Sequence, residues 1–166
     1  MSKTIKVRLT EQSIKNAIRE LESYKAWVEE KEAELRQRLA QRGATVASIQ
    51  FARAVYNGVN KVRVRVDDTG SVAVIYAEGE AVAFIEFGSG RKHGYGHPDA
   101  AKHGFGPGTW SDGPDGKGHW DDPNGWWIPK EKGGGHSYGN PPAMAMYNAV
   151  QAIAESVTEI AREVFK

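Results

Sequence analysis

The stretch from Gly88 to Asn140 most constrains the fold, because it is too poor in aliphatic side chains to build a core. Among Val, Ile, Leu and Met it holds only Ile128, yet it carries four of the five tryptophans, all five histidines and 15 of the 19 glycines. Large amphipathic rings bury area at low entropic cost, as interface residues do. We therefore expect an ordered contact loop, anchored at both ends in a small domain, rather than a solvated linker.

The chain of 166 residues has the length of one domain with one modest core. We expect that core to come from residues 1–87 and 141–166, with the contact loop 88–140 inserted between them. This loop is far longer than an ordinary connection, which marks it as functional or disordered. Its tryptophans favour a function.

Bulk properties exclude several classes of protein. The formal charge of +1 gives no general attraction to nucleic acid or to an anionic membrane. The absence of cysteine removes disulfides and thiolate chemistry. Residues 1–4 lack an apolar segment typical of a secretory signal, and no apolar run approaches the roughly 20 residues that span a bilayer. We expect a protein made in a cytoplasm, with no membrane partner and no specific nucleic-acid partner.

The N-terminal third predicts a short strand and then a long helix. Ile5, Val7 and Leu9 alternate with basic residues, as in a strand with one buried face. Thr10 is a candidate N-cap, with Ser13 as a weak capping-box partner. Apolar residues at helical spacing predict a helix over residues 11–41, which Gly43 would end. The apolar stripe is longer than a small sheet can cover, so either a partner chain or solvent meets the excess.

The rest of the core reads as a hairpin and a second helix. Residues 44–56 weakly favour a helix, and residues 62–66 and 71–77 predict two strands joined at Asp68–Gly70. Residues 81–87 fit either a helix or a strand. After Pro141, Pro142 suits the first turn of a C-terminal helix whose stripe we expect to be buried against the sheet; it includes Val150, Ile153, Val157 and Ile160. The predicted class is α+β, with a small antiparallel sheet, a long N-terminal helix and a C-terminal helix.

The loop histidines and aspartates invite a metal site, but the spacing does not favour one. His93 and His97 are separated by glycines and followed by Pro98, so no helix presents both imidazoles on one face. Asp112, Asp115, Asp121 and Asp122 lack the register of a calcium loop, and Asp-Gly steps are typical of turns. We predict no metal and no cofactor.

Glu86 stands among apolar residues just before the loop. A general acid is one interpretation, since apolar surroundings disfavour the charged form. The other is a carboxylate that accepts backbone N–H groups near Gly88 and Gly90 and fixes the angle at which the loop leaves. No second carboxylate lies near it in sequence, and Gly88-Ser89-Gly90 is neither a nucleophile elbow nor a phosphate loop. We predict that the loop is anchored by Glu86, Phe87, Gly88, Gly90, Pro141 and Pro142.

Trp126 and Trp127 could stack on sugars or bases, but such a pair more often anchors a loop or an interface. We predict that the interface residues are Trp110, Trp120, Trp126, Trp127 and Tyr138.

Four blocks together resemble a family of phage proteins. They are Val82 to Gly90, with the signature Glu-Phe-Gly-Ser-Gly; His97-Pro98-Asp99-Ala100-Ala101; Gly125-Trp126-Trp127; and Asn140 to Ala149, the entry to the last helix. In the first block Ser89 replaces the Thr of the family signature. In the last, Met144-Ala145 stands where the family more often has an x-Pro-Phe sequence. The family is that of the minor head–tail connector and tail-completion proteins of long-tailed phages.

The resemblance implies a structural, non-enzymatic virion protein of the phage neck, assembled in the bacterial host cytoplasm. Such a protein would form a homo-oligomeric ring and contact a connector or adaptor, a tail terminator or a tail tube. Two other classes stay open. One is a metal-dependent hydrolase using the loop histidines and aspartates, and the other is a carbohydrate-binding module using the tryptophan pair.

Overall fold

The computed structural model describes residues 4–54, 61–79, 81–90, 92–105, 124–132 and 134–166. In chain order its elements are α1 (Glu11–Arg53), β1 (Arg63–Asp67), β2 (Val74–Glu78), α2 (Val82–Phe87), the 3-10 turn η1 (Ala101–His103), β3 (Trp126–Ile128), the 3-10 turn η2 (Lys130–Lys132), β4 (Gly135–Ser137) and α3 (Ala145–Val164). The fold is α+β, as the sequence predicts.

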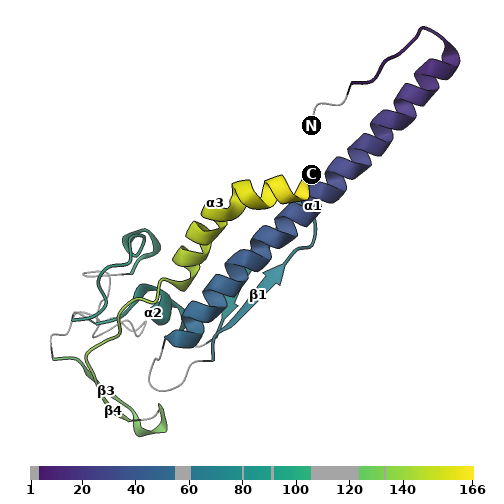
Figure 1. Ribbon diagram of the computed structural model, residues 1–166. Coiled ribbons are helices and arrows are strands. Elements are labelled where there is room, and N and C mark those ends of the chain that lie inside the picture. Colours follow the sequence, from purple (N-terminus) through teal and green to yellow (C-terminus); the bar gives the residue numbers. More distant parts are fainter. Residues whose placement is uncertain (1–3, 55–60, 80, 91, 106–123, 133) are drawn as a thin grey trace.

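Helix α1, with 43 residues, is the longest element, and the central hairpin and α3 lie along it (Figure 1). The β1–β2 hairpin and α3 pack on its C-terminal part, and α3 ends where Phe165 meets the edge of Trp27 at 5.9 Å between ring centroids. N-terminal to Trp27, α1 projects beyond the other elements, and its large apolar residues there are exposed: Ile14, Ile18, Leu21 and Tyr24. Among the described helices none is long and apolar enough to cross a membrane.

The predicted start of α1 is confirmed, but its predicted end is wrong. The Thr10 hydroxyl accepts from the Ser13 amide at 3.3 Å, and the Arg8 amide donates to the Ser13 hydroxyl at 2.9 Å. Gly43 does not end the helix, because it lies buried where α1 meets its neighbours. A Cβ at Gly43 would come within 2.6 Å of Ile153 and 2.7 Å of Ile75. The glycine allows close packing, and the helix predicted over 44–56 continues α1 to Arg53.

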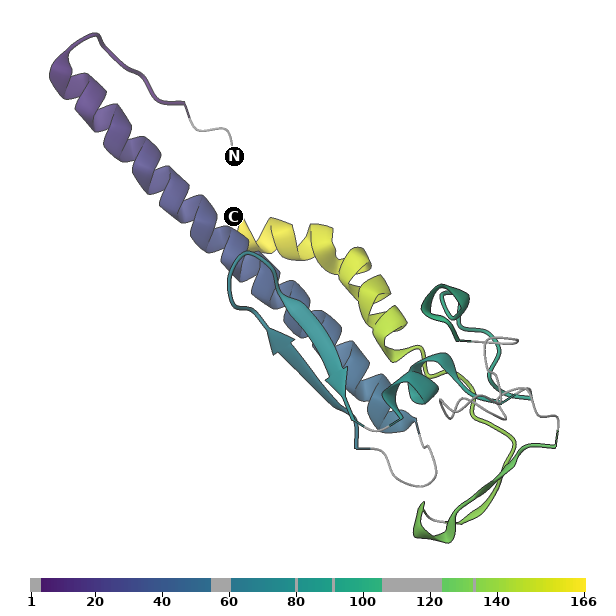
Figure 2. The ribbon, with the colours of Figure 1, turned by 180° about the vertical axis from the view of Figure 1, so that it is seen from behind.

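The predicted strand over Ile5 to Leu9 is also wrong, because residues 4–8 have no regular structure in the described chain. They lie at the projecting end of α1, away from the hairpin (Figures 1 and 2), so no strand is there to pair with them.

The central hairpin is confirmed with shifted bounds. β1 and β2 pair antiparallel, with Arg65 opposite Tyr76, and Val64, Val66, Ile75 and Ala77 occupy the more buried face. A second two-stranded sheet joins β3 and β4. The ambiguous stretch 81–87 forms a helix, α2.

α3 begins later than the sequence predicts, and only part of its predicted stripe is covered, since Ile153 and Ile160 are half-buried. Its N-cap is Met144, in the left-handed region with φ 51°, so Pro142 lies before the helix and not in its first turn. Val150 is 60% exposed and Val157 is exposed, while Ala145, Ala149 and Val164 are buried. α3 packs mainly on α1, through these residues and through Ile153, which lies against Gly43, and this leaves Val150 and Val157 outside the contact.

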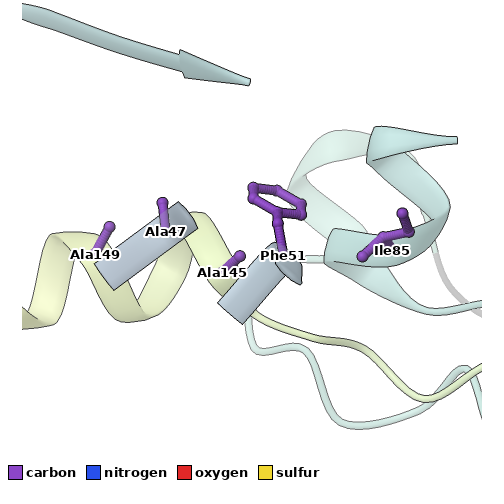
Figure 3. Close-up of a cluster of buried hydrophobic side chains, with 5 residues drawn as sticks. All are labelled: Ala47, Phe51, Ile85, Ala145 and Ala149. Carbon is purple, nitrogen blue, oxygen red and sulfur yellow. The ribbon is translucent and has the colours of Figure 1, made fainter. Parts of the chain in front are cut away.

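The core is small and lies at the C-terminal end of α1 (Figure 3). Ala47 and Phe51 of α1 meet Ala145 and Ala149 of α3, and Ile85 of α2 completes the cluster. Alanines bring the two helices close together, and Phe51 and Ile85 are the large side chains in the gap. This cluster fixes α2 beside the start of α3.

We expect Phe51→Ala to lower the free energy of unfolding by about 3–5 kcal/mol, because it removes a fully buried ring. Val150→Ala is the matched control, since its exposed side chain should change stability by no more than about 0.5 kcal/mol. Urea denaturation followed by circular dichroism measures both. A large loss in Val150→Ala would show that the packed face of α3 is assigned wrongly.

Candidate interaction site: the Glu86 junction and the aromatic hairpin

The buried carboxylate of Glu86 provides the N-terminal cap of α3. It accepts the Met146 amide at 2.9 Å on Oε2 and the Tyr147 amide at 3.0 Å on Oε1. These are the second and third residues of the helix, whose amides have no partner within it. An N-cap side chain usually binds them, but Met144 offers no such bond. Glu86 supplies it from another element, where the helix dipole also favours its charge.

His97 completes the surroundings of this carboxylate. Its Nε2 lies 3.3 Å from Glu86 Oε1, and its Nδ1 accepts the Asp99 amide at 3.1 Å. Because Nδ1 accepts, the hydrogen of a neutral imidazole is assigned to Nε2, which donates to Glu86. Both side chains are buried. The loop after Gly90 is therefore fastened to α2 and α3 through one carboxylate.

The two ends of the inserted loop are also joined through the backbone. Ser89 and Asn140 exchange two N–H···O bonds of 2.8 Å, and the Ala143 amide donates to the Ile85 carbonyl at 2.8 Å. Gly88 and Gly90 have φ near 78° and 77°, and a Cβ on Gly90 would come within 2.4 Å of the Tyr138 carbonyl. Glycine is needed here both for the positive φ and for the close approach of the two chains.

Aromatic rings pack around Phe87, next to this junction. The Phe105 ring stacks on Phe87 at 4.6 Å between centroids, and His97 approaches its edge at 4.5 Å. A cavity of about 530 Å³ opens beside these rings, and its lining includes Ala77 of β2, Val82 of α2, and Met146 and Val150 of α3. Glu86 and His97 contribute to its wall. The cavity is mainly apolar.

On the rim of this region Asp99 and Lys102 form an exposed pair 2.5 Å apart. The hydrogen bond from Lys102 holds the pKa of the Asp99 carboxyl below its usual value, and the same bond raises the pKa of Lys102. This pair stabilises the η1 turn only weakly, because exposed ion pairs contribute little.

The β3–β4 hairpin, with Tyr138 after it, displays a row of rings that we call the aromatic hairpin. Trp127 is 76% exposed and meets His136 edge-on at 4.9 Å, and His136 meets Tyr138 at 4.6 Å. Lys92 lies 5.6 Å from the Tyr138 ring centre. Exposed rings at the end of an anchored loop are typical of a protein contact.

The predicted anchor residues and the predicted interface residues lie in different parts of the structure. The six predicted anchors lie at or beside the junction, but Glu86 takes its amides from α3 and not from the Gly88–Gly90 turn. Trp127 and Tyr138 are exposed, whereas Trp126 is half-buried. Trp110 and Trp120 lie outside the described residues, as do Asp112, Asp115, Asp121 and Asp122. Within the described part of the chain, no three His, Asp or Glu residues are grouped as metal ligands.

Sequence reasoning missed the role of His97 as a partner of Glu86, and it missed Met146 and Tyr147 as the donors. One signal was present. Residues 141–144, directly before α3, include no Ser, Thr, Asp or Asn, so a helix that starts there needs a cap from elsewhere.

No family model, curated protein or solved structure matches this chain. The resemblance in the four sequence blocks is therefore left to experiment.

We expect Glu86→Ala to destabilise the protein by about 1–3 kcal/mol for each backbone donor left unpaired. The stability of Glu86→Gln should lie between those of Glu86→Ala and the wild type, because the glutamine side chain has one oxygen acceptor where the carboxylate has two. Limited proteolysis between Gly88 and Gly139 should accelerate in the same order, read by mass spectrometry. Glu159→Ala, an exposed carboxylate on α3, is the control. Equal stability of Glu86→Ala and the control would contradict the capping role.

Proposed function

We propose that this protein is a structural subunit of the phage neck, which assembles as a ring and joins the head to the tail. The observation that carries the proposal is the meeting of separate sequence blocks at one place. Residues 82–90, 97–101 and 140–149 come together around Glu86. The fourth block, 125–127, pairs with β4, which leads directly to Asn140.

The bonding of Glu86 and His97 supports a structural role over a catalytic one. Both oxygens of Glu86 accept helix amides, and both nitrogens of His97 have hydrogen-bond partners. A general acid or base needs an oxygen or nitrogen available to a substrate, and although Glu86 and His97 line the apolar cavity, their polar atoms are already engaged within the protein. These two side chains instead hold the loop in place and allow the aromatic hairpin to be presented on a fixed base.

A ring requires two different surfaces on each subunit, because each copy contacts the next through unlike faces. The described structure offers two exposed candidates at opposite ends. One is the aromatic hairpin, and the other is the projecting part of α1 with Ile14, Ile18 and Leu21.

Deletion of the gene tests the proposal in the phage or prophage that encodes it. We expect separate heads and tails by electron microscopy, and joined particles after complementation with the wild-type gene. Joined, infectious particles in the deletion strain would overturn the proposal, as would a genome without portal, capsid and tail-tube genes nearby.

We expect Trp127→Ala to leave the melting temperature unchanged, because the ring is mostly exposed, and to abolish particle joining. Complementation titre and circular dichroism are the measurements. Val72→Ala is the matched control, since Val72 is an exposed apolar residue on the other hairpin. A normal titre from Trp127→Ala together with Tyr138→Ala would remove the aromatic hairpin from the interface.

A further inference from the structure

Residues 4–9, which we call the N-terminal arm, have the sequence pattern of a strand but pair with no sheet within the described chain. Ile5, Val7 and Leu9 alternate with Lys6 and Arg8, and Leu9 is 98% exposed. The base of the arm is fixed, because the Arg8 amide binds the Ser13 hydroxyl and the Thr10 amide binds the Arg8 carbonyl at 2.8 Å. An exposed, alternating segment of this kind is suited to adding to the edge of a sheet.

The arm cannot reach the sheet of its own chain. The nearest end of the central hairpin is marked by the ion pair between Arg36 and Asp68. Along α1, Glu11 and Arg36 are about 38 Å apart at 1.5 Å per residue. Ile5 lies at most about 18 Å from Thr10, even in a fully extended chain. A sheet partner for the arm must therefore come from another molecule.

The free edge of β2, the side not paired with β1, is the site that fits the arm. Among the described residues, the β2 backbone bonds only to β1. β2 is the strand nearer α3, since Ile75 and Ile153 both lie against Gly43, and β1 is on the outside (Figure 2). The apolar cavity lies on this side, lined by Ala77 of β2 and by Met146 and Val150 of α3. A strand added here would place its apolar face beside Ala77 and toward that cavity.

Charge favours β2 over β1 as the acceptor. The outer face of β1 carries Arg63 and Arg65, which would lie beside Lys6 and Arg8 of an added arm. Like charges on neighbouring strands destabilise a sheet. The outer face of β2 carries Val74, Tyr76 and Glu78, whose carboxylate pairs with Arg65 at 3.0 Å, so this strand places no cation beside Lys6 and Arg8.

We propose that the arm of one copy adds as a strand to the free edge of β2 in a second copy, with Val7 and Leu9 turned toward the apolar cavity. Donor and acceptor are different surfaces, so the contact repeats from copy to copy and closes into a ring where the rotation allows. Only this last step rests on the proposed function. The arm exchange itself rests on the pattern, reach, cavity and charge described above.

Disulfide trapping tests the contact, because the wild-type chain contains no cysteine. Full-length Tyr76→Cys is mixed with mass-tagged Arg8→Cys, and in a second mixture with mass-tagged Lys6→Cys. Arg8 and Lys6 are the outward-facing positions of the added strand, so the two mixtures cover the two registers in which one of them lies opposite residue 76. Neighbouring strands bring such Cβ atoms within disulfide distance. The control mixture pairs each arm variant with Glu155→Cys, an exposed position on α3. Oxidation traps contacts as they form, so rare association still accumulates product.

We expect the mixed disulfide with Tyr76→Cys to form several-fold faster than the control disulfide, in at least one register. Adding Val7→Asp to the arm variant should reduce it to the control rate with an unchanged melting temperature, whereas Val7→Ile should not. Equal rates with Tyr76→Cys and Glu155→Cys in both registers would overturn the arm exchange.

Native mass spectrometry of an oxidised double variant, which carries Tyr76→Cys and the arm cysteine in one chain and can be joined to two neighbours, separates this inference from the proposed function. A closed ring supports both. A trapped pair that never grows beyond two subunits supports the arm exchange and contradicts the ring. Normal particle joining by Val7→Asp together with Leu9→Asp supports the neck function and overturns the arm contact.

Discussion

The arrangement of the loop depends on the hydrogen bonds that the Glu86 carboxylate makes. This carboxylate lies at the end of a six-residue helix, and it binds the first-turn amides of α3, which begins far away in the sequence. A helix that starts at Met144 has no side-chain cap of its own. Removing the carboxylate would leave two partly buried donors unpaired at the point where both ends of the inserted loop meet. One side chain thus links α2, the loop and α3.

This linkage explains how the two ends of a segment almost without aliphatic residues are held in place. Its ends are fastened by the Ser89–Asn140 backbone pair, by glycines that permit close approach, and by His97 on Glu86. The aromatic hairpin is then carried on a base that the core fixes, and Trp127 and Tyr138 remain exposed. Ordered contacts and exposed rings suit a surface that another protein covers. This is the basis for proposing an assembly role.

The sequence predicts the features that depend on neighbouring residues. The Thr10 cap, the central hairpin and the α+β class are confirmed, since caps, turns and alternation are local signals. The sequence-based prediction fails where contacts between elements far apart in the chain determine the structure. Gly43 continues a helix because Ile75 and Ile153 need the space, and Val150 is exposed because α3 packs through alanines. For Glu86, sequence indicated backbone donors, but only the fold brings Met146 and Tyr147 to it.

Hydrogen exchange at two amides tests the central claim most directly. Amides in the first turn of a helix normally exchange quickly, because they have no intrahelical partner. We predict that the amides of Met146 and Tyr147 are protected in the wild-type protein, and that Glu86→Ala removes this protection while the Ala149 amide, further into α3, stays protected. Fast exchange of Met146 and Tyr147 in the wild type, beside a protected Ala149, would contradict the account.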